Sequence, residues 1–399
     1  MKHAASHWLN RERFTRYPRL FLLLFIVLGI AWALLAKNHV DLKGKPLGYD
    51  FITFWAASYL GLHNHAPLAY DLASIFRAEQ AAVPASNSVF VWYYPPTFYV
   101  LILPLALLAY FPAYWTFMLL TLAAYVCAMR RIVRTPDAMW CLAAFSGAWM
   151  NLFHGQNAFL TAALAAAALL CLEKRPVLAG VFIGLLAIKP HLALLFPIAL
   201  IAIGAWRTFV VAAATAILFM VISTAIMGTD TLMASVHSLG YARLFLETGT
   251  LPWPKMPTVF AFLRLLGTPV SLAYAVHAVV ALVAIRTVWR IWRGSQDQRL
   301  RAAALMTGTF LVSPYVFDYD LAWLAFPIAW LALCGLETGW RTAEREILAA
   351  AWLLPLIMAP FATPTHIQLG PIVLGALLWI TWRRARSPYA ASPSAASGS

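Results

Sequence analysis

The chain has 399 residues, of which 62% are hydrophobic and only 11% are charged, and its mean hydropathy is +0.75. A soluble domain with a polar surface cannot have this composition, so we expect a polytopic membrane protein. The net charge of +14 does not indicate a nucleic-acid partner, because the basic residues gather in short segments between apolar runs, as they do in cytoplasmic loops.

Apolar runs recur along the whole chain and predict an all-α fold with about 12 transmembrane helices. Several runs are shorter than the roughly 20 residues that cross a bilayer core, so we expect some helices to be tilted or buried among neighbours. The runs are residues 20–36, 111–129, 138–153, 158–172, 177–188, 192–205, 208–227, 271–292, 302–317, 321–336, 347–361 and 371–382.

The first run is expected to be a permanent anchor. It follows nineteen mostly polar residues, and no cleavage site of small residues comes after it, so it does not resemble a signal peptide. If the basic clusters at its start, at 130–134 and at 383–386 are cytoplasmic, both termini are cytoplasmic as well.

Residues 97–108 pose a choice between a full span and a shorter segment. A full span here would place Arg130, Arg131 and Arg134 on the outer face, against the positive-inside pattern. We therefore expect 97–108 to lie along the outer face or re-enter it, because apolar stretches of about 10–14 residues are often interfacial or re-entrant.

This topology gathers most acidic residues and histidines on the outer face. They lie in a first long outer loop (37–96), a second long outer loop (228–267), and shorter loops at 154–157, 189–191, 313–320 and 363–368. Because the cytoplasmic loops are short connectors, any chemistry is expected on the outer side.

Other signals narrow the field. The four cysteines fall within spans, and the chain has no P-loop, dinucleotide-binding glycine pattern or His-Glu-x-x-His motif. Gly180 and Gly184 are spaced for close helix packing. Residues 1–386 are expected to form one membrane domain, and the Ser-, Ala- and Pro-rich tail 387–399 to be disordered.

The order of several outer-face motifs resembles that of the family 87 glycosyltransferases. These motifs are Gly48-Tyr49-Asp50-Phe51, Tyr70-Asp71, Tyr94-Pro95-Pro96, Gly155-Gln156-Asn157, the string from Ala179 to Gly184 that leads to Lys189-Pro190, and Ser313-Pro314. Such enzymes have the GT-C fold and take a sugar from a polyprenyl phosphate.

The resemblance implies a catalytic acid and short interfacial helices in the first outer loop, where 51–62 reads as an amphipathic stretch, and a later outer loop that covers the site. It also implies a multi-pass protein of the bacterial inner membrane with a periplasmic active site. The donor would be a β-linked polyprenyl-phosphate sugar, most simply mannose, and the acceptor a glycolipid or glycan. No cofactor or metal is implied, and the oligomeric state stays open.

Asp50 is the candidate general base. Transfer of a sugar to a hydroxyl needs a base for the proton and cations for the departing phosphate. An acid within a few residues of the bilayer can reach a lipid-borne head group, and one displacement with one carboxylate inverts the anomeric centre. The alternative is that Asp50 only caps the helix expected to begin near Phe51, while another acid, Asp71 or Asp318, is the base.

Lys189 is the first candidate for the donor phosphate, because it ends an apolar span next to Pro190. Snorkelling to the interface is its alternative. His191 could donate to the same phosphate or simply pack, while Arg243 and Arg264 in the second long outer loop are weaker candidates that solvation also explains.

The remaining candidates would bind the sugar or the acceptor. His154, Gln156 and Asn157 form a polar segment between two spans, which could equally satisfy helix ends. Asp318 and Asp320 are typical of metal ligands in spacing, but capping of the next helix is the simpler interpretation. The full set of candidates is Tyr49, Asp71, Tyr94, His154, Gln156, Asn157, Asp318 and Asp320.

Two other functions stay open from the residues. A secondary transporter or lipid flippase would also have many spans, but such proteins bind near the bilayer midplane, whereas the polar residues here gather at one face. A lipid-linked glycan ligase or polymerase would share the outer site and differ in its donor.

Overall fold

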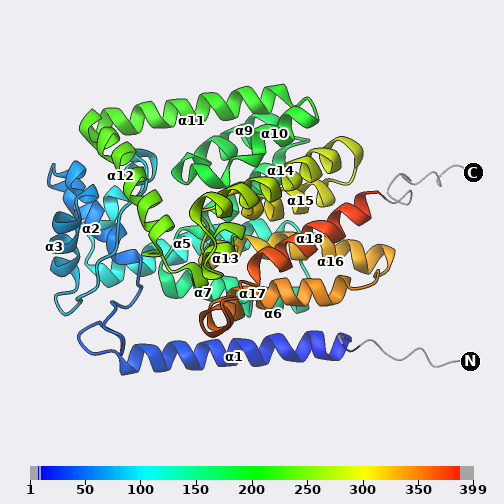
Figure 1. Ribbon diagram of the computed structural model, residues 1–399, viewed down its shortest axis with the longest axis horizontal. Coiled ribbons are helices and arrows are strands. Elements are labelled where there is room, and N and C mark those ends of the chain that lie inside the picture. Colours follow the sequence, from blue (N-terminus) through cyan, green and yellow to red (C-terminus); the bar gives the residue numbers. More distant parts are fainter. Residues whose placement is uncertain (1–7, 9, 387–399) are drawn as a thin grey trace, which may run out of the picture.

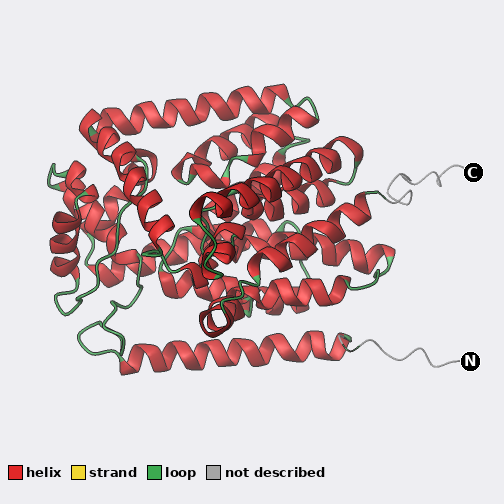
Figure 2. Cartoon of the chain, in the orientation of Figure 1, coloured by secondary structure: helices red, strands yellow, loops and turns green. Residues whose placement is uncertain are grey.

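The computed structural model describes residue 8 and residues 10–386, and these form a bundle of helices (Figure 2). The described residues contain no β-strand, only isolated bridges that join Lys37 to Val40 and Val40 to Pro46. The all-α prediction is therefore confirmed, whereas the GT-C arrangement stays a prediction. The tail for which we predict disorder lies outside the described residues.

The helices follow one another along the chain, with longer connections at 36–50 and 83–95 (Figure 1). The first half contains α1 (Arg11–Leu35), α2 (Phe51–Leu62), η1 (Ala66–Tyr70), α3 (Leu72–Ala82), α4 (Pro96–Ile102), η2 (Leu103–Leu107), α5 (Tyr110–Arg130), α6 (Pro136–Ala143), α7 (Ser146–His154), α8 (Ala158–Cys171), α9 (Pro176–Leu185), η3 (Leu186–Ile188), η4 (Pro190–Leu192) and α10 (Leu195–Ala202). The second half contains α11 (Trp206–Met227), α12 (Thr229–Thr248), η5 (Trp253–Lys255), α13 (Val259–Leu265), α14 (Val270–Gly294), α15 (Gln298–Val312), η6 (Asp318–Leu324), α16 (Ala325–Thr338), α17 (Glu344–Thr365) and α18 (Gly370–Ala385).

Six helical segments among the described residues are long and apolar enough to cross a membrane. They are Glu12–Leu35, Tyr110–Arg130, Trp206–Met227, Val270–Gly294, Asp318–Thr338 and Glu344–Thr365. The other predicted crossings fall on shorter helices such as α8 and α9, so the membrane character is clear while the count of twelve stays a prediction. The start of α1 and the end of α18 lie at the same end of the bundle (Figure 1).

The predicted run 138–153 is not one helix. It is divided into α6 and α7, because Phe145 has an extended backbone and the Ser146 hydroxyl donates a hydrogen bond to the carbonyl of Trp352.

The segment 97–108 forms α4 and η2, and the apolar stretch Pro96–Leu107 is shorter than a membrane crossing needs.

Gly180 and Gly184 let α9 lie directly on α11. A Cβ atom on Gly180 would come within 2.8 Å of the Thr208 carbonyl, and one on Gly184 within 2.7 Å of the Ala212 carbonyl. The prediction of close packing at this glycine pair is confirmed.

The first outer loop folds into a packed group of helices and does not lie flat on a surface. Helix α2 is buried on nearly every side, including Phe51, Phe54 and Ala57, and it lies among η1, α3, α4 and η2. The prediction of an amphipathic helix at 51–62 is therefore wrong, because its small polar residues Thr53 and Ser58 are buried as well.

The second long outer loop forms α12, η5 and α13. Leu246, Met256 and Phe260 make a small core with Phe317 and Tyr319. Through this core the loop packs against the start of η6 and covers the neighbouring ends of the spans.

Candidate active site

A cavity of about 850 Å³ lies between the two long outer loops. Its floor includes the outer end of α7 and residues 188–191, and its walls come from the first outer loop, α12, η5 and residues 314–319. The polar side chains that line it are Lys45, Asp50, Thr53, Tyr93, Tyr94, His154, Gln156, Lys189, His191, Ser235, Arg243, Thr250, Lys255, Tyr274, Tyr315 and Tyr319.

A tight turn before α2 places Asp50 in this cavity. Gly48 has a φ of +88° and Tyr49 a φ of +37°, which reverses the chain just before the acid. Gly155, with a φ of +61°, lies so close that a Cβ atom there would be 2.5 Å from the Cβ of Phe51. This contact between α7 and α2 brings Gln156 beside Asp50.

Asp50 ends a chain of hydrogen bonds. The Tyr94 hydroxyl donates to Oε1 of Gln156 at 2.8 Å, and Nε2 of Gln156 donates to Oδ2 of Asp50 at 2.9 Å. The Asp50 side chain makes no capping bond to α2. The capping alternative is thus not what the structure shows, and the carboxylate faces the cavity from a fixed position.

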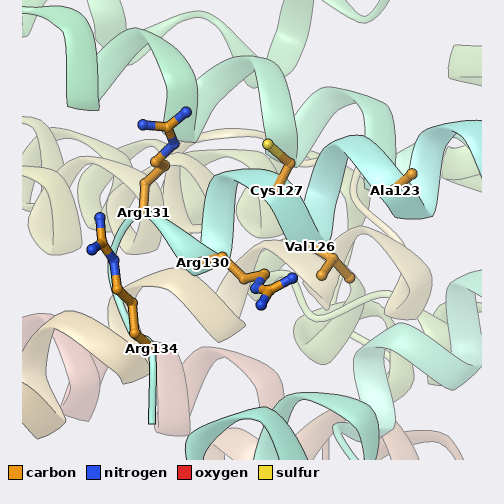
Figure 3. Close-up of a pocket in the computed structure, with 6 residues that line it drawn as sticks. All are labelled: Ala123, Val126, Cys127, Arg130, Arg131 and Arg134. Carbon is orange, nitrogen blue, oxygen red and sulfur yellow. The ribbon is translucent and has the colours of Figure 1, made fainter.

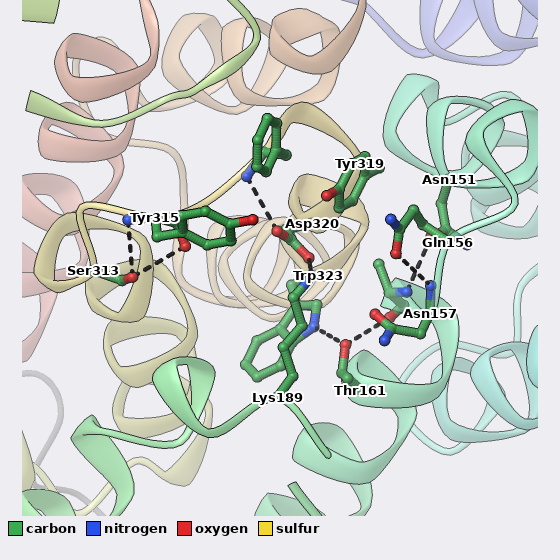
Figure 4. A network of polar contacts seen from close by, with 12 residues as sticks. Asn151, Gln156, Asn157, Thr161, Lys189, Ser313, Tyr315, Tyr319, Asp320 and Trp323 are labelled. Atoms are coloured by element: carbon green, nitrogen blue, oxygen red, sulfur yellow. Dashed lines mark hydrogen bonds and ion pairs between the residues drawn. The ribbon is translucent and has the colours of Figure 1, made fainter. Parts of the chain in front are cut away.

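Lys189 is buried and neutralised. Its side chain is 5% exposed, and its Nζ lies 2.5 Å from Oδ1 of Asp320, whose Oδ2 accepts from the Phe317 backbone N–H. Figure 4 shows this pair within a polar network that links 151–161, Lys189 and 313–323. Asp320 therefore both caps η6 and balances the charge of Lys189.

Two cations in the cavity, Lys45 and Lys255, have no carboxylate partner among the described residues. The Nζ of Lys45 lies 5.7 Å from the centroid of the Tyr49 ring, whereas Lys255 contacts a histidine. The Nζ of Lys255 lies 2.9 Å from Nε2 of His154, whose Nδ1 lies 2.8 Å from the Met150 carbonyl. Since a carbonyl only accepts, Nδ1 carries the imidazole proton and Nε2 accepts from the ammonium. A neutral ring holds Lys255, and its positive charge stays available to a ligand.

His191 cannot supply a second positive charge at neutral pH. Burial, and then the nearby Lys189, lower the pKa of His191 to about 3. Its Nε2 is buried without a hydrogen-bond partner among the described residues and borders the cavity, so a neutral imidazole remains able to bond to a ligand.

Two predicted residues lie buried next to the cavity. Asn157 is fully buried, and neither side-chain atom of its amide has a partner within the described chain. Asp318 is fully buried too, with Oδ1 accepting from the Tyr319 backbone N–H and Oδ2 unpaired. Neither side chain lines the cavity.

Other predicted residues have mainly local roles in the structure. Asp71 accepts from the Ser74 backbone N–H at the start of α3, and hydrogen bonds to Ser74 hold its pKa below the usual range. The Tyr49 hydroxyl donates to Asp41. Arg264 bonds to the carbonyls of Thr268 and Glu247, and neither it, Tyr49 nor Asp71 lines the cavity.

Arg243 does border the cavity, but it is paired with Glu247 at 2.7 Å and is largely exposed. Exposed pairs of this kind contribute little to stability, and the guanidinium can exchange partners with a ligand.

Sequence reasoning did not select Lys255, Tyr315 or Tyr319. A lone lysine beside Trp253 and Pro254 in a long outer loop was the one signal for Lys255.

Glu79 is a buried acid near the site. Its side chain on α3 is fully buried, Oε2 accepts from the Phe90 backbone N–H, and Oε1 has no partner in the described part of the chain. Burial raises the pKa of Glu79 to about 9, so the folded protein holds it protonated at neutral pH.

The folded state therefore binds one more proton than the unfolded state between the unfolded pKa of 4.5 and about 9. Stability conferred by protonated Glu79 is complete below that window and is lost as the pH rises through it, at up to about 1.4 kcal/mol per pH unit. We expect Glu79→Gln to flatten this fall in denaturation midpoints measured from pH 5 to pH 9. An unchanged slope in the variant would contradict the assignment.

No three His, Cys, Asp or Glu side chains of the described residues converge as ligands of a metal ion would.

Comparison with known families gives one match. Residues 92–314, more than half of the chain, match the model of glycosyltransferase family 87. The matched segment includes Tyr94, Gln156, Lys189 and Lys255, while Asp50 and Asp320 lie outside it. No curated protein and no solved structure matches the chain.

Proposed function

The chain belongs to glycosyltransferase family 87, and from this we propose that it transfers a sugar from a polyprenyl-phosphate donor to an acceptor hydroxyl. The observation that carries the proposal is one cavity that holds a positioned carboxylate, Asp50, and an uncompensated cation, Lys255. Its volume of about 850 Å³ is typical of small-ligand sites.

Asp50 is the base in this proposal. Its carboxylate takes the proton of the acceptor hydroxyl while the acceptor oxygen bonds to the anomeric carbon and the bond to the donor phosphate breaks. Polyprenyl phosphate leaves with the bonding electron pair. One displacement without a covalent intermediate inverts the anomeric centre.

Lys255 is the main phosphate ligand in this proposal, with Arg243 and neutral His191 beside it. A free ammonium stabilises the negative charge that grows on the leaving phosphate. The earlier candidate, Lys189, is already balanced by Asp320. Its contribution to the phosphate is therefore smaller, and holding η3 to η6 is its main role.

The lipid tail of the donor fits an apolar side of the cavity. Met220 in the second half of α11 and Leu232, Val236 and Leu239 on α12 line it there. Val236 and Leu239 are more than half exposed, so this wall faces the surroundings of the bundle. A polyprenyl chain can lie across this wall while its phosphate reaches Lys255.

The identities of the sugar, the acceptor and the membrane are inferred from the family resemblance. We infer a β-linked polyprenyl-phosphate mannose as the donor, an α-mannoside on a glycolipid or glycan as the product, and a periplasmic site in a bacterial inner membrane. The gathering of basic segments at the face opposite the cavity supports that orientation.

A donor comparison tests the function. Purified protein in vesicles receives labelled polyprenyl-phosphate mannose, an oligosaccharide pyrophosphate lipid or a nucleotide sugar, each with a membrane glycolipid extract as acceptor. We expect label transfer from the first donor alone. Transfer from the pyrophosphate lipid would indicate a ligase or polymerase, and movement of the donor across the bilayer without its consumption would indicate a flippase.

Gln156 positions the base Asp50 in this proposal. Two substitutions of Gln156 distinguish the effect of the position of Asp50 from the effect of charge beside it. We expect Gln156→Ala to lower kcat about 10- to 100-fold, because a misplaced reacting group loses proximity. Gln156→Glu would add a like charge beside Asp50, raise the pKa of the pair and shift the pH–rate profile upward. The profiles are measured for both variants and Tyr94→Phe; an unshifted Gln156→Glu profile would contradict the contact.

A further inference from the structure

A second hollow, of about 520 Å³, lies at the end of α5 (Figure 3). Ala123, Val126 and Cys127 form its apolar side, and Arg130, Arg131 and Arg134 form its basic side. The start of α5 is near the catalytic cavity, since the Tyr110 hydroxyl donates to the Leu47 carbonyl. Because α5 has 21 residues, this hollow is about 30 Å from that start, at the opposite face.

The three guanidinium groups lack acidic partners in the part of the chain that the structure describes. No ion pair of the described residues includes Arg130, Arg131 or Arg134. Some other arginines are compensated: Arg299 pairs with Asp297 and Glu337, and Arg384 pairs with Glu344. Arg207, Arg290 and Arg293 have no ion pair among the described residues, but none of them lines this hollow. Three uncompensated cations around one hollow favour an anionic ligand, and arginine suits a phosphate in particular.

An exposed apolar stripe leads into the hollow along the same helix. Trp115, Leu119 and Leu120 are each at least half exposed. The helix rises about 15 Å from Leu120 to Arg130, which equals the hydrocarbon thickness of one bilayer leaflet. A ligand that fills both parts has a phosphate head and apolar chains, which distinguishes a lipid from a soluble phosphate.

We propose that this hollow binds one anionic phospholipid of the inner leaflet, with its phosphate on Arg130, Arg131 and Arg134 and its acyl chains along α5. The site is separate from the catalytic cavity and does not depend on the proposed donor. The lipid would neutralise the end of α5 and fix its depth in the membrane.

Lipid titration followed by native mass spectrometry tests the proposal. Purified protein in neutral detergent is titrated with phosphatidylglycerol, phosphatidylcholine or inorganic phosphate. Each basic residue near an anionic lipid surface strengthens association roughly fivefold, so we expect Arg130→Gln/Arg131→Gln/Arg134→Gln to weaken phosphatidylglycerol binding about 100-fold. Equal binding of inorganic phosphate, or an unchanged affinity of the triple variant, would overturn the proposal.

A matched control removes the same charge elsewhere. The control variant Arg207→Gln/Arg290→Gln/Arg293→Gln changes three arginines that do not line the hollow. It should keep the wild-type affinity for phosphatidylglycerol. An equal loss in this control would mean general surface charge and would overturn the proposal.

A second variant keeps every charge. Ala123→Trp should weaken binding by filling the hollow, and bound lipid should protect the exposed Cys127 of the wild type from thiol reagents. If Ala123→Trp keeps full affinity and lipid leaves Cys127 unprotected, the site is not this hollow.

Discussion

Replacing Asp50 by Asn is expected to lower the transfer rate about 10²- to 10⁴-fold, the usual contribution of a general base. The amide oxygen of Asn can still accept from Nε2 of Gln156, so the position of the side chain is kept while its basicity is lost. The initial rate of sugar transfer and the unfolding midpoint of the same preparation are the measurements. Wild-type transfer by a folded Asp50→Asn protein would remove Asp50 from the chemistry.

Asp71→Asn provides the matched control. The same chemical change is made in the same outer loop, at an exposed position that caps α3 and does not line the cavity. Because Asn caps a helix as well as Asp does, both stability and transfer should stay near wild type. A rate loss equal to that of Asp50→Asn would show that acids in this loop act generally and not through the cavity.

Lys189→Met is expected to cost about 3–5 kcal/mol of stability, because it leaves Asp320 as a buried charge without its partner. The double variant Lys189→Met/Asp320→Leu should regain most of this loss, since both charges are then removed. Reversible unfolding in detergent, compared between single and double variants, measures the coupling. Stability that falls equally in both would contradict the pair.

Lys255→Met should lower activity and leave stability nearly unchanged. Its partner His154 is neutral, so the fold loses little, whereas the donor loses a charged hydrogen bond, which lowers kcat/KM about 10- to 100-fold. A stable but inactive Lys189→Met together with a fully active Lys255→Met would return the phosphate to Lys189.

Hydrophobic pattern was sufficient to predict the class of fold. Long runs such as 208–227 and 271–292 became α11 and α14, because apolar length alone determines such helices. The division between α6 and α7 depends on a contact between Ser146 and Trp352 from distant helices. Local sequence could not indicate that break, nor the burial of α2 by later elements.

The cavity was predictable in part. Asp50, Tyr94, His154, Gln156, Lys189 and His191 all line it, because the topology places their segments at one face. Their partners were not predictable. Lys189 meets Asp320 across 131 residues, and Lys255 meets His154 across 101 residues. Which lysine keeps a free charge depends on these long-range pairs, and for this reason we propose Lys255, not the predicted Lys189, as the main phosphate ligand.

The central claim, that this cavity holds the donor between Asp50 and Lys255, is tested most directly by a structure with a non-transferable polyprenyl-phosphonate sugar. The account predicts the phosphonate within hydrogen-bond reach of Lys255, the anomeric carbon facing the Asp50 carboxylate, and the lipid chain against Leu232, Val236 and Leu239. Density for the analogue outside this cavity, or with the sugar turned away from Asp50, would contradict it.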